Sequence, residues 1–201
     1  DVNHQPGIND PAIRPNQIFA IGGLPVSLFE DERARLILES VEDNLLTPLG
    51  LRSLAASEPG YVHRYEGGVR ERDGAYHQGT VWPFLLGPFV SAWIKVYGTS
   101  KTVRRQARTF LSGIEEHLND ACLGQVSEIF DGDPPHTARG CCAQAWSVAE
   151  PLRALLEDVG VQTDGQNITR KRGSVRQRKK TASQSTQTNR AKKTARGRRR
   201  R

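Results

Sequence analysis

Sulfur-containing residues and long apolar runs are scarce in this chain, and each scarcity excludes a class of protein. The sequence has no methionine and only three cysteines, Cys122, Cys141 and Cys142. None belongs to a C-x-x-C pair, and an odd number without a secretory signal predicts reduced thiols in a cytoplasmic protein. Adjacent Cys141 and Cys142 are expected to be small buried side chains in a helix. No apolar run is long enough to span a bilayer, so we expect no membrane contact.

Acidic residues are missing from the last part of the chain. Residues 170–201 contain 15 Lys/Arg and no Asp or Glu, which leaves 14 Lys/Arg against 22 Asp/Glu in residues 1–169. The net charge of +7 therefore combines an acidic globular part with a basic tail. From about Asn167 the sequence is almost without apolar residues, so it cannot offset the entropy of ordering. We predict a globular domain over 1–165 and a disordered Arg/Lys-rich tail over 166–201.

Several common site patterns are absent as well. No G-x-S-x-G, Walker or Rossmann pattern occurs. His63, His77 and His136 lack the spacing of a metal site, so we expect neither a metal nor a cofactor. Basic runs in the tail could bind nucleic acid. The acidic remainder and the lack of aromatic residues in the tail argue against this, and nucleic acid is the weakest of the possible partners.

Hydrophobic periodicity predicts an all-α fold with about five helices and no convincing series of strands. The segment Phe84–Ile94 is apolar almost throughout, which is typical of a helix buried on every side. Two long segments with little periodicity, 48–79 and 120–139, are expected to be loops that carry function. The predicted helices cover residues 15–20, 30–46, 80–97, 100–119 and 140–158.

A polar and aromatic segment lies directly before the apolar helix. It places the phenol of Tyr76, the imidazole of His77, the amide of Gln78 and the indole of Trp82 within seven residues. Aromatic faces can cover the C–H face of a sugar while amides bind its hydroxyls, so the pattern suits a neutral, hydroxyl-rich ligand. A core helix preceded by an ordinary loop explains the same pattern equally well.

Glu128 is the carboxylate that stands out. It lies between Val126 and the pair Ile129-Phe130, a setting that can partly desolvate it. Hydrolysis of an acetal between sugars requires two carboxyl groups, and Asp131 and Asp133 are close by in sequence. The alternative is that these aspartates belong to a turn and that Glu128 is an ordinary loop residue.

Seven segments together resemble the C-terminal glucosidase domain of glycogen debranching enzymes. They fall in the family's order over about residues 14–158, which makes the resemblance specific. The segments are Arg14-Pro15-Asn16-Gln17, Thr47-Pro48-Leu49-Gly50-Leu51-Arg52, Tyr65-Glu66-Gly67-Gly68, Tyr76-His77-Gln78-Gly79-Thr80-Val81-Trp82-Pro83, Leu86-Gly87-Pro88-Phe89, Ser127-Glu128-Ile129-Phe130-Asp131-Gly132 and Ala143-Gln144-Ala145-Trp146-Ser147-Val148-Ala149-Glu150.

The resemblance implies an (α/α)6 toroid that hydrolyses α-1,6-linked glucose with inversion, in glycogen catabolism. It implies that Glu128 is the general base. In the resulting hypothesis of a glycoside hydrolase, the pattern residues Tyr76, His77, Gln78 and Trp82 hold glucose units. Asp73 is a further sugar-binding candidate. The family's general acid is an aspartate far upstream of the base, and no position here matches it.

Five helices are too few for a twelve-helix toroid. We therefore interpret the chain as the C-terminal part of a debranching enzyme, acting on glycogen, limit dextrin or maltooligosaccharide and inactive by itself. Apolar faces of helices such as 80–97 would be left uncovered and would favour association. The alternative is a non-catalytic module that binds α-glucan.

Overall fold

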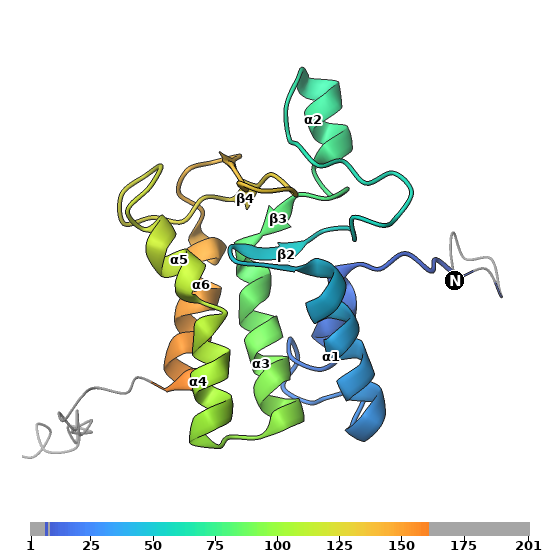
Figure 1. Cartoon of the computed structure of the whole chain (residues 1–201), viewed down its shortest axis with the longest axis vertical. Coiled ribbons are helices and arrows are strands. Elements are labelled where there is room, and N and C mark those ends of the chain that lie inside the picture. Colours follow the sequence, from blue (N-terminus) through green and yellow to red (C-terminus); the bar gives the residue numbers. More distant parts are fainter. Residues whose placement is uncertain (1–6, 8, 161–201) are drawn as a thin grey trace, which may run out of the picture. The chain divides into compact units, whose positions relative to one another are not determined.

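The computed structural model describes residue 7 and residues 9–160, which form a bundle of helices with a small sheet across one end (Figure 1). The predicted tail and the predicted domain boundary lie outside the described residues. With η for a 3-10 or π-helical turn, the elements in chain order are η2 (Pro15–Ala20), α1 (Asp31–Leu45), β1 (Leu46–Thr47), β2 (Gly50–Arg52), α2 (Val69–Ala75), β3 (Val81–Trp82), η3 (Pro83–Leu85), α3 (Leu86–Tyr97), α4 (Lys101–Thr109), α5 (Ser112–His117), β4 (Ile129–Phe130), β5 (Ala138–Arg139), α6 (Ala145–Arg153) and η4 (Ala154–Val159).

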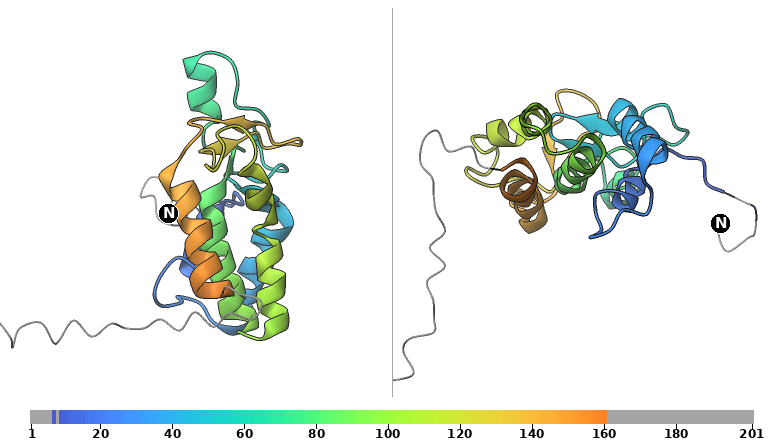
Figure 2. Two further views of the ribbon diagram at one scale, coloured as in Figure 1. Left: turned by 90° about the vertical axis from the view of Figure 1, so that its left-hand side faces the viewer. Right: turned by 90° about the horizontal axis from the view of Figure 1, so that it is seen from below.

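Helix α3 is the centre of the bundle. Every residue from Leu86 to Ala92 is buried, as the continuous apolar run predicts. It packs against α1, α4, α6 and η2, and it contributes to both hydrophobic clusters of the core. Figure 2, seen from below, shows α3 between α1 and the pair α4 and α6. The expectation that this helix has an uncovered apolar face is therefore wrong for its first two turns.

The approach of α6 to α3 is close enough to require a glycine. A Cβ built on Gly87 would lie 2.9 Å from the Cβ of Glu150 and 2.3 Å from its Oε2. Distances this short leave no room for a methyl group unless the two helices move apart. Gly87 thus fixes how near α6 lies to α3, the helix that follows the aromatic segment of the candidate site.

Two predicted helices are confirmed in position and one is divided. Helix α1 occupies Asp31–Leu45 and buries Ala34, Leu38, Val41 and Leu45 at the predicted three- and four-residue spacing. The short helix at Pro15 is present as η2. The expected helix over 100–119 is split into α4 and α5, with Phe110 and Leu111 between them. Segment 48–79, expected to be a loop, also contains α2.

The sheet shows that the all-α prediction is only partly correct. Its five strands run antiparallel to their neighbours in the order β1-β2-β3-β4-β5. Leu51 pairs with Trp82, Val81 with Phe130, and Ile129 with Arg139. Each strand has only two or three residues, which is too short to show a two-residue periodicity. The sheet places the segment around Glu128 directly beside the segment that contains Trp82.

The last predicted helix begins later than expected. Residues 140–144 are irregular, and α6 starts at Ala145 and continues into the π-helical turn η4. Gly140 has a φ of +66°, which favours glycine and interrupts a helix. As a result Cys141 and Cys142 are exposed, and the prediction that they are buried helical residues is wrong. Leu152 and Leu156 of the same segment are also about half exposed.

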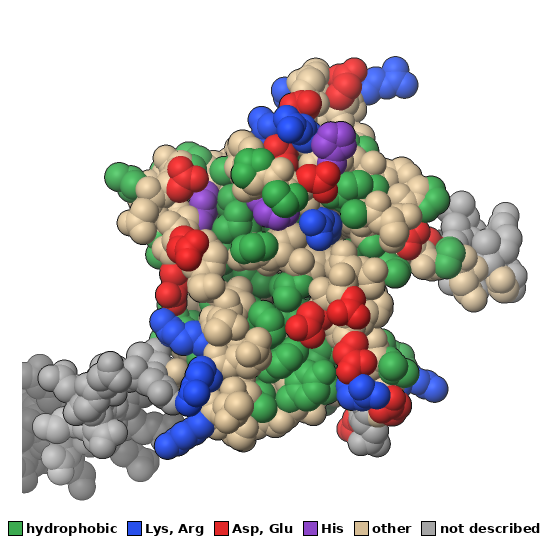
Figure 3. Space-filling view, viewed as in Figure 1, with side chains coloured by type: hydrophobic (Ala, Val, Ile, Leu, Met, Phe, Trp, Pro, Cys, Tyr) green, Lys and Arg blue, Asp and Glu red, His purple; other side chains and the backbone are tan. Residues whose placement is uncertain are grey.

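Charged side chains are spread over the face shown in Figure 3, over α1 as well as over α2. Hydrophobic side chains are visible between the helices below the sheet (Figure 3). Among the described residues, no helix combines the length and the apolar character that crossing a bilayer requires. The expected toroid stays a prediction.

Candidate active site

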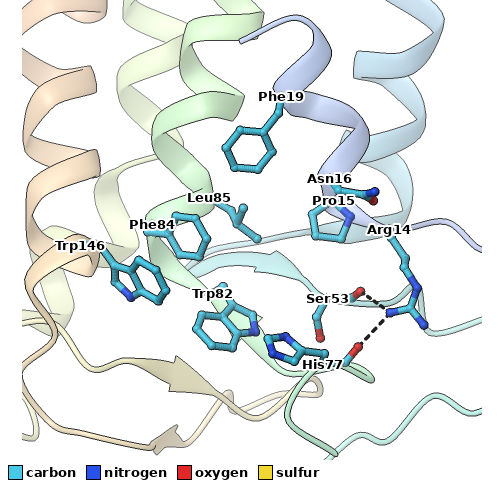
Figure 4. Close-up of a pocket in the computed structure, with 10 residues that line it drawn as sticks. All are labelled: Arg14, Pro15, Asn16, Phe19, Ser53, His77, Trp82, Phe84, Leu85 and Trp146. Atoms are coloured by element: carbon cyan, nitrogen blue, oxygen red, sulfur yellow. Dashed lines mark hydrogen bonds between the residues drawn. The ribbon is translucent and has the colours of Figure 1, made fainter. Parts of the chain in front are cut away.

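A cavity of about 280 Å³ opens where η2, β3, η3 and α6 meet (Figure 4). Trp82 and His77 lie together at one end, and Phe84 and Trp146 lie side by side (Figure 4). The lining is therefore largely aromatic, with polar groups from Arg14, Asn16, Ser53 and His77. The complete lining is Arg14, Pro15, Asn16, Phe19, Ser53, His77, Trp82, Phe84, Leu85 and Trp146.

The aromatic rings of the cavity support one another. The His77 imidazole is stacked on the Trp82 indole, with 5.2 Å between ring centroids and 6° between planes. Phe84 and Trp146 are stacked in the same way at 4.6 Å. Trp82 is only 4 % exposed, whereas Trp146 is 45 % exposed. Trp82 therefore has almost no exposed surface for a ligand. The exposed ring surface belongs to its neighbours, above all Trp146.

Polar groups next to Trp82 are held by hydrogen bonds within the protein. Its Nε1 donates to the Thr80 hydroxyl at 3.0 Å, and that hydroxyl donates to the Tyr76 carbonyl at 2.6 Å. The Arg14 guanidinium donates to the carbonyl of His77 at 2.9 Å and to Oε1 of Gln78 at 2.8 Å. These bonds connect the N-terminal segment to the turn after α2.

Glu128 lies directly before β4, partly buried, and hydrogen bonds hold both of its carboxylate oxygens. The Tyr76 hydroxyl donates to Oε1, and the Cys141 backbone N–H donates to Oε2 at 2.9 Å. The Glu128 backbone N–H also donates to the Cys141 carbonyl at 2.8 Å. Each carboxylate oxygen has a second lone pair, so a water molecule can still bind there.

Tyr76 connects this carboxylate to the aromatic cavity. Its ring centroid lies 4.8 Å from that of His77 and 4.9 Å from that of Trp82, edge to face in both cases. Burial raises the pKa of the Tyr76 hydroxyl well above its usual value, and the hydrogen bond to the Glu128 carboxylate raises it further. The phenol therefore stays protonated at neutral pH and acts as a donor to Glu128.

A glycine makes room for the carboxylate. A Cβ on Gly140 would lie 2.5 Å from Oε2 of Glu128 and 3.1 Å from its Cβ. The same residue has a positive φ, so two independent features favour glycine at this position. The loop over 140–144 therefore passes close enough for the Cys141 amide to reach Glu128.

The comparison with known families agrees with this arrangement. A family model described as amylo-alpha-1,6-glucosidase matches residues 1–153. The chain belongs to the amylo-alpha-1,6-glucosidase family. The resemblance seen in the sequence is confirmed, and the matched residues form a glycoside hydrolase domain of this family.

Four of the residues predicted to bind sugar in this amylo-alpha-1,6-glucosidase domain gather around the cavity. His77 and Trp82 line it, Tyr76 contacts both rings, and Gln78 accepts a hydrogen bond from Arg14. Asp73 is separate from them. It lies exposed on α2, and no side-chain partner for it is present among the described residues. The individual roles in sugar binding stay predictions.

The two aspartates near Glu128 have structural partners. Asp131 is 4 % exposed, pairs with the Arg139 guanidinium at 2.9 Å and accepts the Tyr65 backbone N–H at 2.8 Å. Asp133 accepts the Tyr61 hydroxyl at 2.7 Å. Burial and this hydrogen bond raise the pKa of Tyr61 to about 12. Both carboxylates thus stabilise the loop after β4, as expected for turn aspartates.

Sequence reasoning did not single out Arg14, Phe84 or Trp146 as residues of the site. Trp146 follows Arg14 by more than 130 positions, so only the fold brings them to one cavity. Arg14 and Trp146 do occur in segments that carry the family resemblance, so the resemblance could have identified them as residues of the site. Within the described part of the chain, no three His, Cys, Asp or Glu side chains converge in the way a metal site needs.

Proposed function

We propose that this chain supplies the general base and part of the sugar pocket for hydrolysis of α-1,6-glucosidic branch linkages with inversion. Glu128 is the base, and the substrate is the branched α-glucan of glycogen or limit dextrin. The observation that carries the proposal is the Glu128 carboxylate, held by Tyr76 and Cys141 beside an aromatic cavity. Family membership supports the type of reaction.

The geometry of Glu128 suits activation of a water molecule. An inverting glycosidase uses one carboxylate as a base toward water and one carboxylic acid to protonate the leaving oxygen. The base must accept a proton from water, and the Tyr76 O–H and the Cys141 N–H hold one carboxylate oxygen of Glu128 each. The same donors fix the direction of its free lone pairs, which orients the attacking water.

The aromatic cavity suits a neutral sugar. Phe84 and Trp146 present stacked ring faces that can cover the apolar C–H surface of a glucose unit. Arg14 and Asn16 on the opposite side offer donors for hydroxyl groups (Figure 4). We propose that Trp146 and His77 contact the glucan directly, and that Trp82 acts by holding the His77 ring.

The lining of this cavity contains no Asp or Glu among the described residues. A general acid for the leaving oxygen is accordingly not part of the cavity. We propose that the acid comes from another segment of the enzyme, as the family resemblance implies. The chain would then be complete in its base and incomplete in its acid.

A substrate that needs no acid tests this division. Fluoride leaves α-D-glucosyl fluoride without protonation, so a base that activates water is sufficient. We expect the full chain to hydrolyse it and to release β-glucose first, observed by proton NMR. Glu128→Gln should lower the rate at least about 100-fold, because the amide cannot take the proton from water.

Glu157→Gln is the matched control, because Glu157 has a side chain that is 69 % exposed on η4, away from the cavity lining. It should hydrolyse the fluoride at the wild-type rate. Equal turnover by Glu128→Gln would exclude Glu128 as the base. Release of α-glucose as the first product would exclude inversion.

A non-catalytic module that binds α-glucan is the second candidate, favoured by the absence of a carboxylate from the cavity lining. It predicts saturable binding of maltooligosaccharides without turnover of the fluoride. Trp146→Ala should weaken binding about tenfold or more, because it removes an exposed stacking surface. Unchanged affinity in this variant would reject binding at this cavity.

A further inference from the structure

A second polar cluster lies around His117, the last residue of α5. The His117 side chain is buried and lines a different cavity of about 320 Å³. It does not belong to the aromatic cavity described above. Its side chain nevertheless contacts Ser127, the residue before Glu128.

The imidazole of His117 binds both polar groups of Ser127, the residue before Glu128. Its Nε2 lies 3.1 Å from the Ser127 hydroxyl oxygen and accepts the Ser127 backbone N–H at 3.3 Å. Its ring also packs edge to face on Phe130, with 4.8 Å between centroids. His117 therefore contacts the chain on both sides of Glu128.

These contacts depend on an Nε2 atom without a proton. Only the bare nitrogen can accept the Ser127 N–H, so the neutral ring carries its proton on Nδ1. Ser127 is 1 % exposed, and in the described part of the chain His117 provides the acceptor for its N–H. Water cannot replace this acceptor without opening the structure before β4.

We propose that His117 is a positioning residue for Glu128, because its Nε2 anchors Ser127 and thereby fixes the backbone that carries the base. This inference rests on the proposed role of Glu128 in hydrolysis. His117 holds the chain before Glu128, and the Cys141 backbone holds Glu128 from the other side. The backbone that carries the carboxylate is thus held from two sides.

A Ser-His-Asp catalytic triad is a different interpretation, and the geometry opposes it. Asp120 lies 3.8 Å from His117 Nδ1, but its side chain is 79 % exposed. A nucleophilic serine must reach a substrate, whereas the Ser127 hydroxyl belongs to a residue with 1 % exposure. The cluster is built to hold the backbone and not to attack a ligand.

Protonation of His117 should release this anchor. A proton on Nε2 turns the acceptor into a donor, which leaves the Ser127 N–H unpaired. Burial lowers the pKa of His117, and the Asp120 carboxylate opposes this only in part. The other titratable residues that line this cavity are Glu116 and His136. Base-catalysed turnover should therefore fall on the acidic side as His117 takes up a proton.

Two substitutions separate anchoring from simple packing. His117→Gln places an amide oxygen near the position of Nε2 and does not titrate. His117→Phe keeps a ring against Phe130 but removes the acceptor. For α-glucosyl fluoride and the full chain, His117→Phe should lower kcat about 10- to 100-fold with KM within twofold, as expected for a misplaced base. His117→Gln should retain kcat within threefold and should lose the part of the acidic decrease that His117 causes.

His136→Gln is the matched control, because His136 lines the same cavity but binds the Asp131 carbonyl. It should keep the wild-type pH profile. Wild-type kcat in a folded His117→Phe protein, or an unchanged acidic limb in His117→Gln, would overturn the proposal.

A measurement that does not depend on turnover tests the role of His117 independently of the proposed function. In nitrogen NMR of the wild-type chain, we expect His117 to carry its proton on Nδ1. The Ser127 and Glu128 amide signals should shift with the same midpoint as the His117 ring. Amides that do not follow the ring would refute the anchor. Full turnover by Glu128→Gln would instead refute the proposed function, and the amide titration would still decide whether His117 holds Ser127.

Discussion

Among single residues, Tyr76 joins the two halves of the candidate site. Its hydroxyl donates to Glu128, while its ring contacts both His77 and Trp82. A hydrogen bond from a neutral phenol to a carboxylate belongs to the stronger class, because one partner is charged. Tyr76 can therefore transmit any displacement of the aromatic rings to the base.

Tyr76→Phe removes only this hydroxyl. Its ring contacts are kept, so the cavity should still bind maltooligosaccharide with an affinity within about twofold of the wild type. The loss of one hydrogen bond to a charged group corresponds to about 1.5–3 kcal/mol, and kcat for the fluoride should fall about tenfold or more. Steady-state kinetics with binding by calorimetry measures both quantities. Unchanged kcat would show that the Tyr76 hydroxyl does not position Glu128.

Ser147 gives a stability prediction at the same scale. It is completely buried, and its hydroxyl has no hydrogen-bond partner in the described structure. Ser147→Ala should raise the free energy of unfolding by about 1 kcal/mol, because the penalty for burying the hydroxyl disappears. Urea unfolding followed by circular dichroism measures this change.

Ser91→Ala is the comparison, with the opposite expected sign. Ser91 is also buried, but its hydroxyl donates to Asp158 at 2.6 Å and accepts from Arg153 at 3.0 Å. Its removal should destabilise the protein by about 1–3 kcal/mol, since charged partners lose a hydrogen bond. A loss of stability in Ser147→Ala would mean that its hydroxyl has a partner after all.

Individual residues were predictable from sequence where local chemistry determines their place. Glu128 between apolar neighbours and the aromatic segment before the buried helix were singled out from the sequence, and the structure connects them through Tyr76, while their roles stay predictions. Cys141 and Cys142 were placed wrongly, because the positive φ of Gly140 depends on the packing of Glu128 against this loop. Trp146 reaches the cavity only through the packing of α6, which no local pattern encodes.

Among the elements, helices were easier to predict than strands. Helix α1 contains four buried residues at regular spacing, so fifteen residues give a repeated signal. Strands β3 and β4 contain two residues each, and their partners are separated by almost 50 positions in the sequence. Their pairing follows from the position of α3 and the loops, and so it could not be read from periodicity.

The contact between α3 and α6 gives a prediction for whole elements. Gly87→Ala places a methyl group where Glu150 atoms lie at 2.3–2.9 Å, so the helices must separate. We expect a loss of about 1–3 kcal/mol in unfolding free energy from this overpacking. Because Trp146 is on α6, the aromatic cavity should widen and bind maltooligosaccharide more weakly. Thermal unfolding and calorimetry report the two effects.

Gly74→Ala is the matched substitution in α2. A Cβ at Gly74 meets no atom within 4 Å, and alanine favours a helix over glycine. This variant should be as stable as the wild type or more stable by up to about 1 kcal/mol. Equal stability of both variants would show that α6 can move away from α3 without cost.

For the molecule as a whole, His117 predicts how stability depends on pH. Its pKa is lowered in the folded state from an unfolded value of about 6.5. Between these two pKa values the unfolded chain binds more protons than the folded chain. The contribution of His117 to stability is therefore fully present above the unfolded pKa and is lost as the pH falls from there through the folded pKa. Urea unfolding at pH 7.5 and 5.5 should show a larger decrease for the wild type than for His117→Gln. An equal decrease in both proteins would place the titration in other groups.

The distribution of charge gives the last prediction. Residues 170–201 contain 15 basic and no acidic side chains, whereas the rest of the chain carries an acidic excess. If the tail binds nucleic acid, the weakest of the hypotheses, the full chain should bind duplex DNA with a steep decrease as salt rises, and a chain that ends at residue 165 should not bind it. Maltooligosaccharide affinity should be the same in both, because the cavity lies within residues 14–146. A full-length control with the tail Lys and Arg replaced by Gln separates charge from length. DNA binding by the shortened chain would assign a nucleic-acid surface to the helical domain, whereas a loss of glucan affinity would make residues 166–201 part of substrate binding.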